Sequence, residues 1–341
     1  MTLVMRPERL GEILAGMKGK RVLVLGDLIA DEYIYGETSR VSREAPVLII
    51  RHVGRRVIPG GAGNAVLNLA ALGALPEPAS VVGADEPARE VLAELAARGI
   101  DPAGVRLDSA RRTIRKTRVM AGGAHGQKQQ VMRIDQEEHV PLDDETEGDL
   151  LRVASDALRR VDAVLFSDYG YGTIGERVRE WVIGQARRRG IPVCADSRYE
   201  LRTFAGVTFA TPNEQEAESA WGRPIRSPED LQAASAALTE QLDADFVLLT
   251  RGQDGMAVSE RNGAFHEIPI WGETEAADVT GAGDTVAAAA LLAIASGAAP
   301  REAAELATVA AGIVVQKHGA ATTTPEEIER FAGIPREAAQ P

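Results

Sequence analysis

Apolar residues along the chain gather in short, unbroken runs, separated by longer stretches with helical patterning. Short apolar runs bounded by glycine or charged residues are typical of strands buried on both faces of a parallel sheet. The runs predict strands at 21–25, 79–82, 163–166, 192–195, 207–210 and 246–249. The intervening stretches predict helices at 64–72, 87–98, 146–159, 174–189, 228–241 and 285–296. This alternation predicts βαβ units and an α/β fold whose mainly parallel sheet is covered on both faces.

Two segments, 33–58 and 113–134, depart from this rhythm because they are rich in charged and β-branched residues and have no helix between their strand-like runs. We expect them to pair with each other outside the main sheet and to form a small β-lid. No repeat, low-complexity linker or shift in composition divides the chain, so residues 1–341 are predicted to form a single domain. The tail after Phe331 is expected to be frayed.

Composition narrows the range of functions. The 341 residues carry 38 Lys+Arg and 50 Asp+Glu, a net charge of −12, with 4% aromatic residues and one cysteine. These values argue against a general nucleic-acid binder, a disulfide framework and a cysteine-rich zinc site. The chain lacks an apolar run of about 18 residues, and its start, MTLVMRPERL, lacks the apolar stretch of a secretory signal. We therefore expect a cytoplasmic protein without membrane or nucleic-acid partners, which must create positive potential locally wherever it binds anions.

The strongest chemical signal is the segment ADVTGAGDT at 277–285, which precedes an alanine-rich helix. Gly281 and Gly283 allow a tight turn whose N–H groups point outward at a helix N-terminus, and such a turn binds anions. Asp284 would lie in the first helical turn, where a carboxylate beside a bound phosphate can accept the proton of an attacking hydroxyl. The same residues would also suit an ordinary helix start, and composition alone leaves both interpretations open.

Polar residues also follow the first predicted strand and open the helix at 64–72. Asn64 and Asn68 lie one turn apart within an apolar stretch, and their amides could bind the hydroxyls of a polyol or simply bond the backbone. Asp27 and Asp31 follow the strand at 21–25, where the carboxyl ends of parallel strands face the ligand-binding crevice. Carboxylates there suit sugar hydroxyls, or a metal ion if more ligands converge.

Two further loops have candidate chemistry. Asn213 and Glu216 are spaced to reach a hydrated Mg²⁺ through water, although the same spacing also predicts a capping box at a helix start. The glycine-containing loop after the strand at 246–249, TRGQDG, could bring backbone close to a nucleotide or form a hairpin turn. The five histidines have no metal-ligand spacing, and Cys194 is interpreted as a core thiol. No Walker-type phosphate loop is present, and no G-x-G-x-x-G fingerprint follows the first predicted strand.

Taken together, these motifs resemble the PfkB (ribokinase-like) family of carbohydrate kinases. PGGAGNAVLNLAALGA at 59–74 resembles the first family signature, and ADVTGAGDTVAAAALL at 277–292 resembles the second. TPNEQE at 211–216 is similar to the N-x-x-E element of the family. The resemblance spans residues 19–330 and implies a ribokinase-like three-layer αβα sandwich with a mainly parallel sheet and a small β-lid.

Within this family the sequence is most similar to the heptose kinases of lipopolysaccharide-precursor synthesis. The similar segments lie at 26–50, 127–138, 166–172, 250–256 and 314–327. The resemblance implies ATP- and Mg²⁺-dependent phosphorylation of the anomeric hydroxyl of D-glycero-β-D-manno-heptose 7-phosphate. Some such kinases carry a fused nucleotidylyltransferase; from the chain length we expect the single-function form. The departures from the pattern are Asp196-Ser197-Arg198 in place of Asp-Pro-Lys, Val286 in place of Phe, and the mild change at Val279.

The resemblance also implies roles for individual residues. Asp284 would be the general base, and backbone N–H groups would stabilise the transferred phosphoryl group at Gly281, Ala282 and Gly283. Sugar-holding positions correspond to Asp27, Asp31, Gly60, Gly61 and Asn64. The positions expected to organise Mg²⁺ through water are Asn213 and Glu216. Nucleotide-binding positions correspond to Thr250, Gly252, Gly255, Lys317, His318 and Gly319. Candidates to bind a substrate phosphate are Arg133, Arg40, Arg43 and Arg51.

Two lids pairing across a two-fold axis would cover their exposed strands, so a homodimer is expected. A PfkB-type kinase for another sugar or nucleoside, such as ribose or an unphosphorylated hexose, remains an alternative. A non-catalytic sugar- or nucleotide-binding sensor on the same fold is a second alternative, although a sensor would not require the carboxylate of Asp284.

Overall fold

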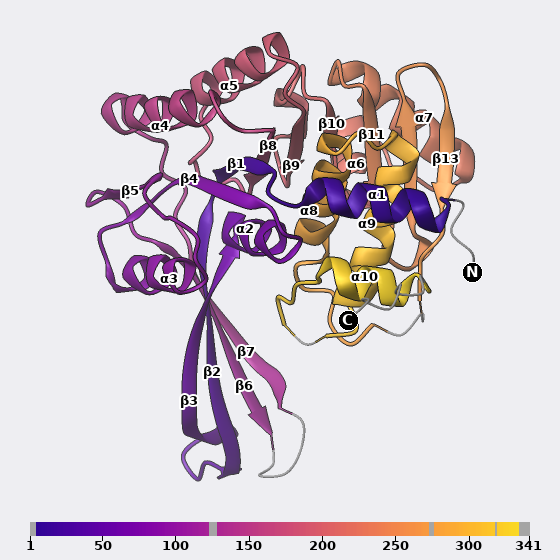
Figure 1. Ribbon diagram of the computed structural model, residues 1–341. Coiled ribbons are helices and arrows are strands. Elements are labelled where there is room, and N and C mark those ends of the chain that lie inside the picture. Colours follow the sequence, from indigo (N-terminus) through magenta and orange to yellow (C-terminus); the bar gives the residue numbers. More distant parts are fainter. Residues whose placement is uncertain (1–4, 123–127, 273–275, 318, 334–341) are drawn as a thin grey trace, which may run out of the picture.

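The computed structural model describes residues 5–122, 128–272, 276–317 and 319–333, which form two β-sheets and their covering helices (Figure 1). The spatial order of the large, nine-stranded sheet is β13 (Phe265–Ile268), β12 (Met256–Glu260), β11 (Phe246–Thr250), β10 (Phe209–Ala210), β9 (Val193–Ser197), β8 (Ala163–Asp168), β1 (Arg21–Gly26), β4 (Leu75–Gly83) and β5 (Val105–Asp108). Neighbouring strands from β11 to β5 are parallel, whereas β12 and β13 add an antiparallel edge.

Helices cover both faces of this sheet. One face packs against α1 (Pro7–Met17), α2 (Ala62–Ala71), α3 (Glu86–Ala97), α8 (Ala282–Ala295), α9 (Pro300–Val314) and α10 (Pro325–Phe331). The other face packs against α4 (Asp144–Ala157), α5 (Glu176–Arg188), α6 (Glu214–Trp221) and α7 (Pro228–Gln241). Because side chains alternate along a strand, β1 contributes Val22 and Val24 to the first core and Leu23 and Leu25 to the second. The predicted three-layer αβα sandwich is therefore confirmed.

Each of the predicted strands and helices is present, with boundaries shifted by a few residues at most ends. The pattern missed β12 and the two edge strands β5 and β13. The edge strands have only four residues each and are partly exposed, so they form no unbroken apolar run. It also did not assign helices to α1, α6, α9 and α10. No helix among the described residues is long and apolar enough to cross a membrane.

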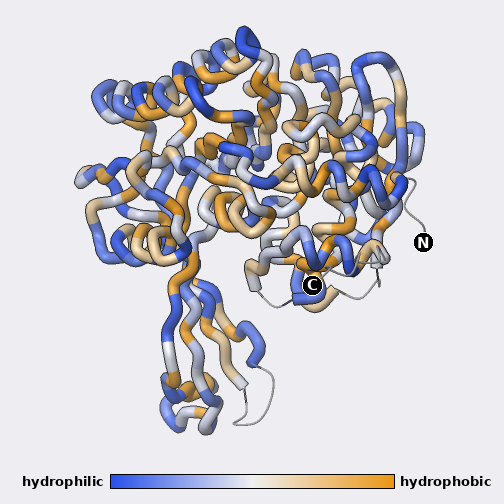
Figure 2. The backbone as a smooth tube through the Cα atoms, in the orientation of Figure 1, coloured by the Kyte–Doolittle hydropathy of each residue, from blue (hydrophilic) through white to orange (hydrophobic). Residues whose placement is uncertain are grey.

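The second sheet has four strands and extends away from the body of the molecule (Figure 1). Its order is β3 (Leu48–Gly61), β2 (Leu28–Val41), β6 (Ile114–Gly122) and β7 (Gln129–Gln136), and we call it the small sheet. The segments at 33–58 and 113–134 thus pair with each other, because β2 lies parallel to β6, although β2 already starts at Leu28. Residues 123–127 lie outside the described residues. Figure 2 shows hydrophobic and hydrophilic residues interleaved along this sheet.

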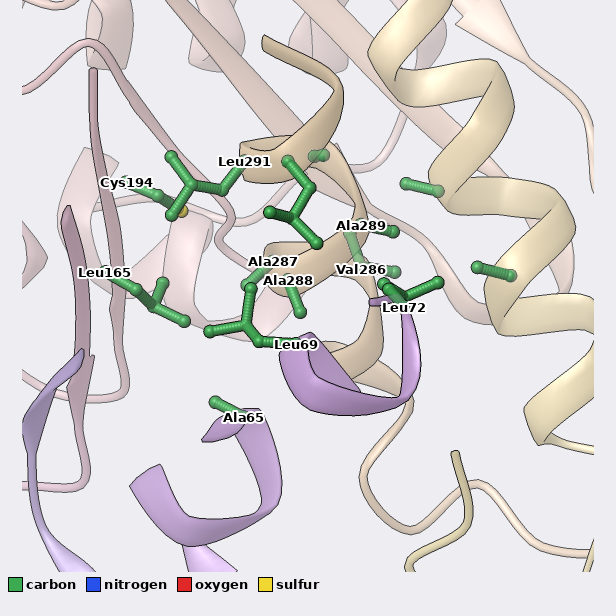
Figure 3. Packing of buried hydrophobic residues seen from close by; sticks show 14 of the residues in the cluster. Ala65, Leu69, Leu72, Leu165, Cys194, Val286, Ala287, Ala288, Ala289 and Leu291 are labelled. Carbon is green, nitrogen blue, oxygen red and sulfur yellow. The ribbon is translucent and has the colours of Figure 1, made fainter. Parts of the chain in front are cut away.

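Small residues let α2 and α8 pack closely (Figure 3). Ala65 and Leu69 of α2 lie in the same buried cluster as Ala287 and Ala288 of α8. The helices are also linked by a buried hydrogen bond of 2.8 Å, which the Thr285 hydroxyl donates to Asn68 Oδ1. This packing places the N-terminal turns of α2 and α8 side by side, although their residues are more than 200 positions apart in the sequence.

Candidate active site

The turn before α8 has the geometry of an anion-binding site. Gly281 caps the helix with a left-handed φ of 80°, and a Cβ atom there would lie 2.4 Å from Asn64 Nδ2. Within the described ranges, the N–H groups of Gly281, Gly283 and Asp284 have no acceptor. Unpaired N–H groups at the positive end of a helix dipole attract anions. The N–H group of Ala282, predicted to act with its neighbours, instead donates to Val279 O at 3.2 Å inside the turn.

Asp284 lies beside this turn and is buried. Asn64 Nδ2 donates to its Oδ2 at 2.6 Å, and the Tyr169 hydroxyl donates to its Oδ1 at 3.0 Å. Burial raises the pKa of Asp284 to about 6, partly opposed by these two hydrogen bonds. A carboxylate with this pKa is ionised at neutral pH and yet basic enough to accept a proton in a reaction. The group therefore combines the location and the basicity expected of a general base.

Several predicted sugar-holding residues surround Asp284. Asn64 bonds it directly, and the carboxylate of Asp31 lies close enough to raise its pKa. Gly60 is required for this arrangement, because a Cβ atom there would lie 2.2 Å from Asp31 Oδ2. Gly61 supplies the turn into α2 with a φ of 57°. The structure therefore brings Asp31 and Asn64 to the site, while the two glycines provide the space and the turn.

The structure shows a structural role for Asp27. Its carboxylate accepts the backbone N–H groups of three residues in the loop after β8, namely Tyr169 at 2.9 Å, Tyr171 at 3.2 Å and Thr173 at 3.2 Å. Asp27 is buried, and both of its oxygens are engaged. A carboxylate fixed in this way shapes the loop that follows β8. Its position after a parallel strand could not distinguish this role from the predicted one.

Arg133 was expected to bind a substrate phosphate, but its guanidinium forms two hydrogen bonds with Asp135, two residues away on β7. Its cross-strand partner Arg118 lies nearer to the site, since it is bonded to Asp31. Sequence reasoning missed Arg118, because only the pairing of β6 with β2 brings it to Asp31. The arginines at the far end of the small sheet behave differently: Arg51 pairs with Glu37, and Arg40 and Arg43 are exposed.

Two other cations, Lys116 and Arg198, lie over tyrosine rings of the loop after β8. The Arg198 guanidinium lies 4.3 Å from the centroid of the Tyr169 ring, and Lys116 Nζ lies 5.5 Å from that of Tyr171. In the described part of the chain, neither side chain forms an ion pair. Burial and the nearby charge of Arg198 lower the pKa of Lys116. The charges of Asp284, Asp196 and Glu216 also act on Arg198, and those of Glu137 and Asp135 act on Lys116, so the two cations lie among carboxylates without forming a close ion pair.

Asn213 and Glu216 form the capping box that their spacing also predicted. Asn213 Oδ1 accepts the N–H of Glu216, and Glu216 Oε2 accepts the N–H of Asn213, both at 2.9 Å. Burial raises the pKa of Glu216, and its charge acts on Arg198 and Asp196 near the site. No cluster of three or more His, Cys, Asp or Glu side chains positioned to hold a metal occurs among the residues that the structure describes.

A cavity of about 420 Å³ adjoins the turn before α8 and is lined mainly by apolar groups. It contains Thr250, Gly252 and Gly255, as predicted for the nucleotide loop, next to Ala282 and Gly283. These loop residues connect β11 to β12, so the loop is also the hairpin turn that the sequence allowed. The remaining lining residues, which sequence reasoning missed, include Trp271, Val279, Thr308, Ala311, Gly312 and Val315.

Lys317 and Gly319 have other partners. Lys317 Nζ is bonded to Glu327 and to the carbonyl oxygen of Thr322, which directs the ammonium group to the start of α10 rather than to the cavity. The N–H of Gly319 donates to Asp278 at 2.9 Å and so ties its loop to the turn before α8. Neither residue lines the cavity. His318 lies outside the described residues.

Comparison with known proteins places these features in a family. A family model described as pfkB family carbohydrate kinase matches residues 20–327. Bifunctional protein HldE of Trichlorobacter lovleyi is 41% identical over 309 residues, and that of Syntrophotalea carbinolica is 38% identical over 316 residues. The alignments cover 90% and 92% of this chain but 62% and 63% of those relatives. The chain thus spans less than two thirds of their length.

Solved structures show the same fold. Ribokinase of Arabidopsis thaliana, complexed with ribose and ATP, aligns with a TM-score of 0.70 and 20% identity, covering 93% of this chain and 100% of that chain. Phosphofructokinase-2 from Escherichia coli, in complex with substrates and products, aligns with a TM-score of 0.73 and 16% identity, covering 92% and 98%. At such low identity these likenesses show the fold alone, which is ribokinase-like. The extent of the family match and the identity to curated relatives show that the chain belongs to the pfkB family of carbohydrate kinases and is a phosphotransferase.

Proposed function

We propose that the protein transfers the γ-phosphoryl group of ATP to the anomeric hydroxyl of D-glycero-β-D-manno-heptose 7-phosphate. The observation that carries the proposal is the Asp284 carboxylate beside the unpaired N–H groups of the α8 turn. Two cations add to it: Arg198, which acts on Asp284, and Lys116, which interacts with Arg198. The heptose-kinase pattern of the sequence and the 38–41% identity to bifunctional protein HldE support the same substrate. We assign this activity to the cytoplasm, where ATP is available.

In this reaction the anomeric oxygen forms a bond to the γ-phosphorus as the bond from that phosphorus to the β,γ-bridging oxygen breaks, and ADP leaves. Asp284 accepts the proton of the anomeric hydroxyl. The unpaired N–H groups of Gly281 and Gly283 stabilise the charge on the transferred group. Asp31 and Asn64 orient the sugar on the side of α2.

The adenine ring would occupy the cavity of about 420 Å³, whose apolar lining suits a flat, mostly apolar base. Asn213 and Glu216 would hold Mg²⁺ through water. The donor set fits, because Mg²⁺ keeps several waters and needs only one or two carboxylates, and the capping box engages one oxygen of Glu216 and leaves the other. When bound, Mg²⁺ supplies neutralisation of the phosphate oxygens.

The substrate phosphate is assigned to Lys116 and Arg198. Phosphate oxygens accept charge-assisted hydrogen bonds from ammonium and guanidinium groups, and a phosphate between these two side chains would relieve their mutual repulsion. An unphosphorylated sugar would leave that repulsion in place. The cation pair therefore favours a phosphosugar over ribose or a free hexose, and it replaces Arg133 as the proposed phosphate ligand.

Replacing Lys116 with methionine tests this assignment. We expect Lys116→Met to raise KM for heptose 7-phosphate at least about tenfold, the loss of one hydrogen bond between charged groups, and to leave KM for ATP unchanged. Steady-state kinetics with heptose 7-phosphate and with unphosphorylated heptose provides the measurement. Lys128→Met is the matched control, since Lys128 also lies over a tyrosine ring of the small sheet, at 5.6 Å from the Tyr35 centroid. Equal losses with both sugars would contradict the assignment.

We further propose that the small sheet is a lid over the sugar and the interface of a homodimer. A closed lid would exclude water, which competes with the sugar for the phosphoryl group. The sheet exposes apolar side chains, which in a soluble protein mark an interface. They are Val41, Val47, Leu48, Ile49, Val53, Val131, Met132 and Ile134.

Sedimentation velocity tests the dimer. We expect a dimer for the unmodified protein and a monomer for Ile134→Asp, because a carboxylate buried in an apolar interface is strongly destabilising. Leu107→Asp is the control. The exposed fraction of Leu107 is 58%, similar to the 51% of Ile134, but Leu107 belongs to the large sheet. A monomeric unmodified protein at micromolar concentration, or a dimer that survives Ile134→Asp, would contradict the interface.

A further inference from the structure

The loop at 169–173, between β8 and α5, is fixed by hydrogen bonds to a buried carboxylate. Its alternate N–H groups, from Tyr169, Tyr171 and Thr173, all donate to the buried carboxylate of Asp27. The intervening Gly170 and Gly172 adopt left-handed φ angles of 78° and 88°. A Cβ atom at Gly172 would lie 2.6 Å from the carbonyl oxygen of Val140. The loop therefore has one narrowly defined conformation, which is fixed by Asp27 at the end of β1.

This conformation directs one side chain to the catalytic carboxylate. The Tyr169 hydroxyl donates to Asp284 Oδ1 at 3.0 Å, while the Arg198 guanidinium covers the face of its ring at 4.3 Å. Burial and the charge of Asp284 raise the pKa of the Tyr169 hydroxyl well above its ordinary value. The hydroxyl therefore stays protonated over the whole working range of pH and acts only as a donor.

We propose that Tyr169 is a positioning residue of the phosphoryl-transfer step, because its hydroxyl fixes the Asp284 carboxylate for the incoming sugar hydroxyl. This inference rests on the proposed role of Asp284 as general base. Each carboxylate oxygen can accept more than one hydrogen bond, so Tyr169 on Oδ1 and Asn64 on Oδ2 leave capacity for the proton of the sugar. Rotation of the carboxylate would break at least one of these two bonds.

The same hydrogen bond lowers the pKa of Asp284. The groups that act on its charge come from four sides: Asn64 on α2, Asp31 on β2, Asp196 and Arg198 at the end of β9, and Tyr169. Burial raises the pKa to about 6, and the Tyr169 hydroxyl opposes that rise by stabilising the ionised form. Activity that needs the ionised form is therefore present above pH 6 and lost as the pH falls through it. Removal of the hydroxyl would move this loss to higher pH.

The test is the pH dependence of kcat/KM for Tyr169→Phe, which keeps the ring under Arg198 and removes only the hydroxyl. We expect the unmodified enzyme to lose activity below about pH 6. In Tyr169→Phe this acid limb should move up by about one pH unit, the size of one hydrogen bond to a charged group. At pH values above this acid limb, kcat of the variant should be about tenfold lower than that of the unmodified enzyme. A purely structural role would lower the midpoint of thermal unfolding without moving the limb.

Tyr171→Phe is the matched control, because its hydroxyl lies in the same loop but donates to Glu137 at 2.6 Å, away from Asp284. Its acid limb should stay at the position of the unmodified enzyme. An unmoved limb in Tyr169→Phe, or equal shifts in both variants, would overturn the inference. Neither of these two results would contradict the proposed function if the Asp284→Asn variant is inactive. An active Asp284→Asn variant would instead overturn the proposed function itself.

Discussion

Asp284→Asn is expected to lower kcat by at least about 100-fold, the range of general-base catalysis, while ATP still binds. The carboxylate is the group beside the unpaired N–H groups of the α8 turn that can accept a proton at neutral pH. An amide of the same shape cannot accept it. ADP formation under saturating ATP and sugar measures kcat, and equilibrium titration with ATP measures the binding that should persist.

The asparagine variant separates catalysis from folding, because it changes few atoms in a buried site. Its thermal unfolding midpoint should stay within a few degrees of that of the unmodified protein. Near-normal turnover in Asp284→Asn would contradict the assignment of the base. A sensor on the same fold would give another result: the unmodified protein would bind ATP and sugar without forming ADP.

Gly281→Ala is expected to lower kcat at least about 100-fold, as the loss of one donor in an oxyanion-type site does. The new methyl group would lie 2.4 Å from Asn64 Nδ2, and the residue would have to keep a φ of 80°. Both effects displace the N–H group of Gly281, and the collision also moves the amide that holds Asp284 Oδ2. We therefore expect a loss in kcat for every sugar, measured as ADP formation at saturating substrate.

Gly297→Ala is the matched control for this variant. Gly297 has a φ of 83° at the opposite end of α8, and a Cβ atom there would have no neighbour within 4 Å. Both alanines carry the same backbone cost of about 1 kcal/mol, so both should lower the thermal unfolding midpoint. Only Gly281→Ala should lower kcat. Equal activity of the two variants would show that the turn does not stabilise the transferred group.

Much of the fold could be predicted from local pattern. The unbroken run at Arg21–Leu25 marks a strand buried on both faces, and the packing of Val22 and Leu23 into opposite cores shows why. Gly281 and Gly283 also allowed the turn before α8 to be predicted from the sequence, because a tight glycine turn depends on local backbone geometry alone. The net charge of −12 does not argue against an anion site, because the positive potential of a helix end and a few cations acts over a short distance.

The remaining site residues depend on tertiary contacts that local pattern does not contain. Tyr169 reaches Asp284 because Asp27 fixes its loop, and this requires the end of β1 to lie beside β8. Lys116 lies on β6 of the small sheet and Arg198 directly follows β9 of the large sheet, so they interact only in the folded chain. Lys317 was predicted to approach the nucleotide, but α10 supplies Glu327 as its partner. The sequence pattern assigned no role to Tyr169, Lys116 or Arg198, because their partners are set by the fold.

The most direct test of the account is ADP formation with a panel of acceptors: heptose 7-phosphate, unphosphorylated heptose, ribose and a free hexose. The account predicts a kcat/KM for heptose 7-phosphate at least about 100-fold above that for any unphosphorylated sugar, consistent with two lost charge-assisted contacts. It also predicts that the product loses its reducing end, because the anomeric hydroxyl is the acceptor. Faster ADP formation with ribose, a free hexose or unphosphorylated heptose, or a product that remains reducing, would contradict it.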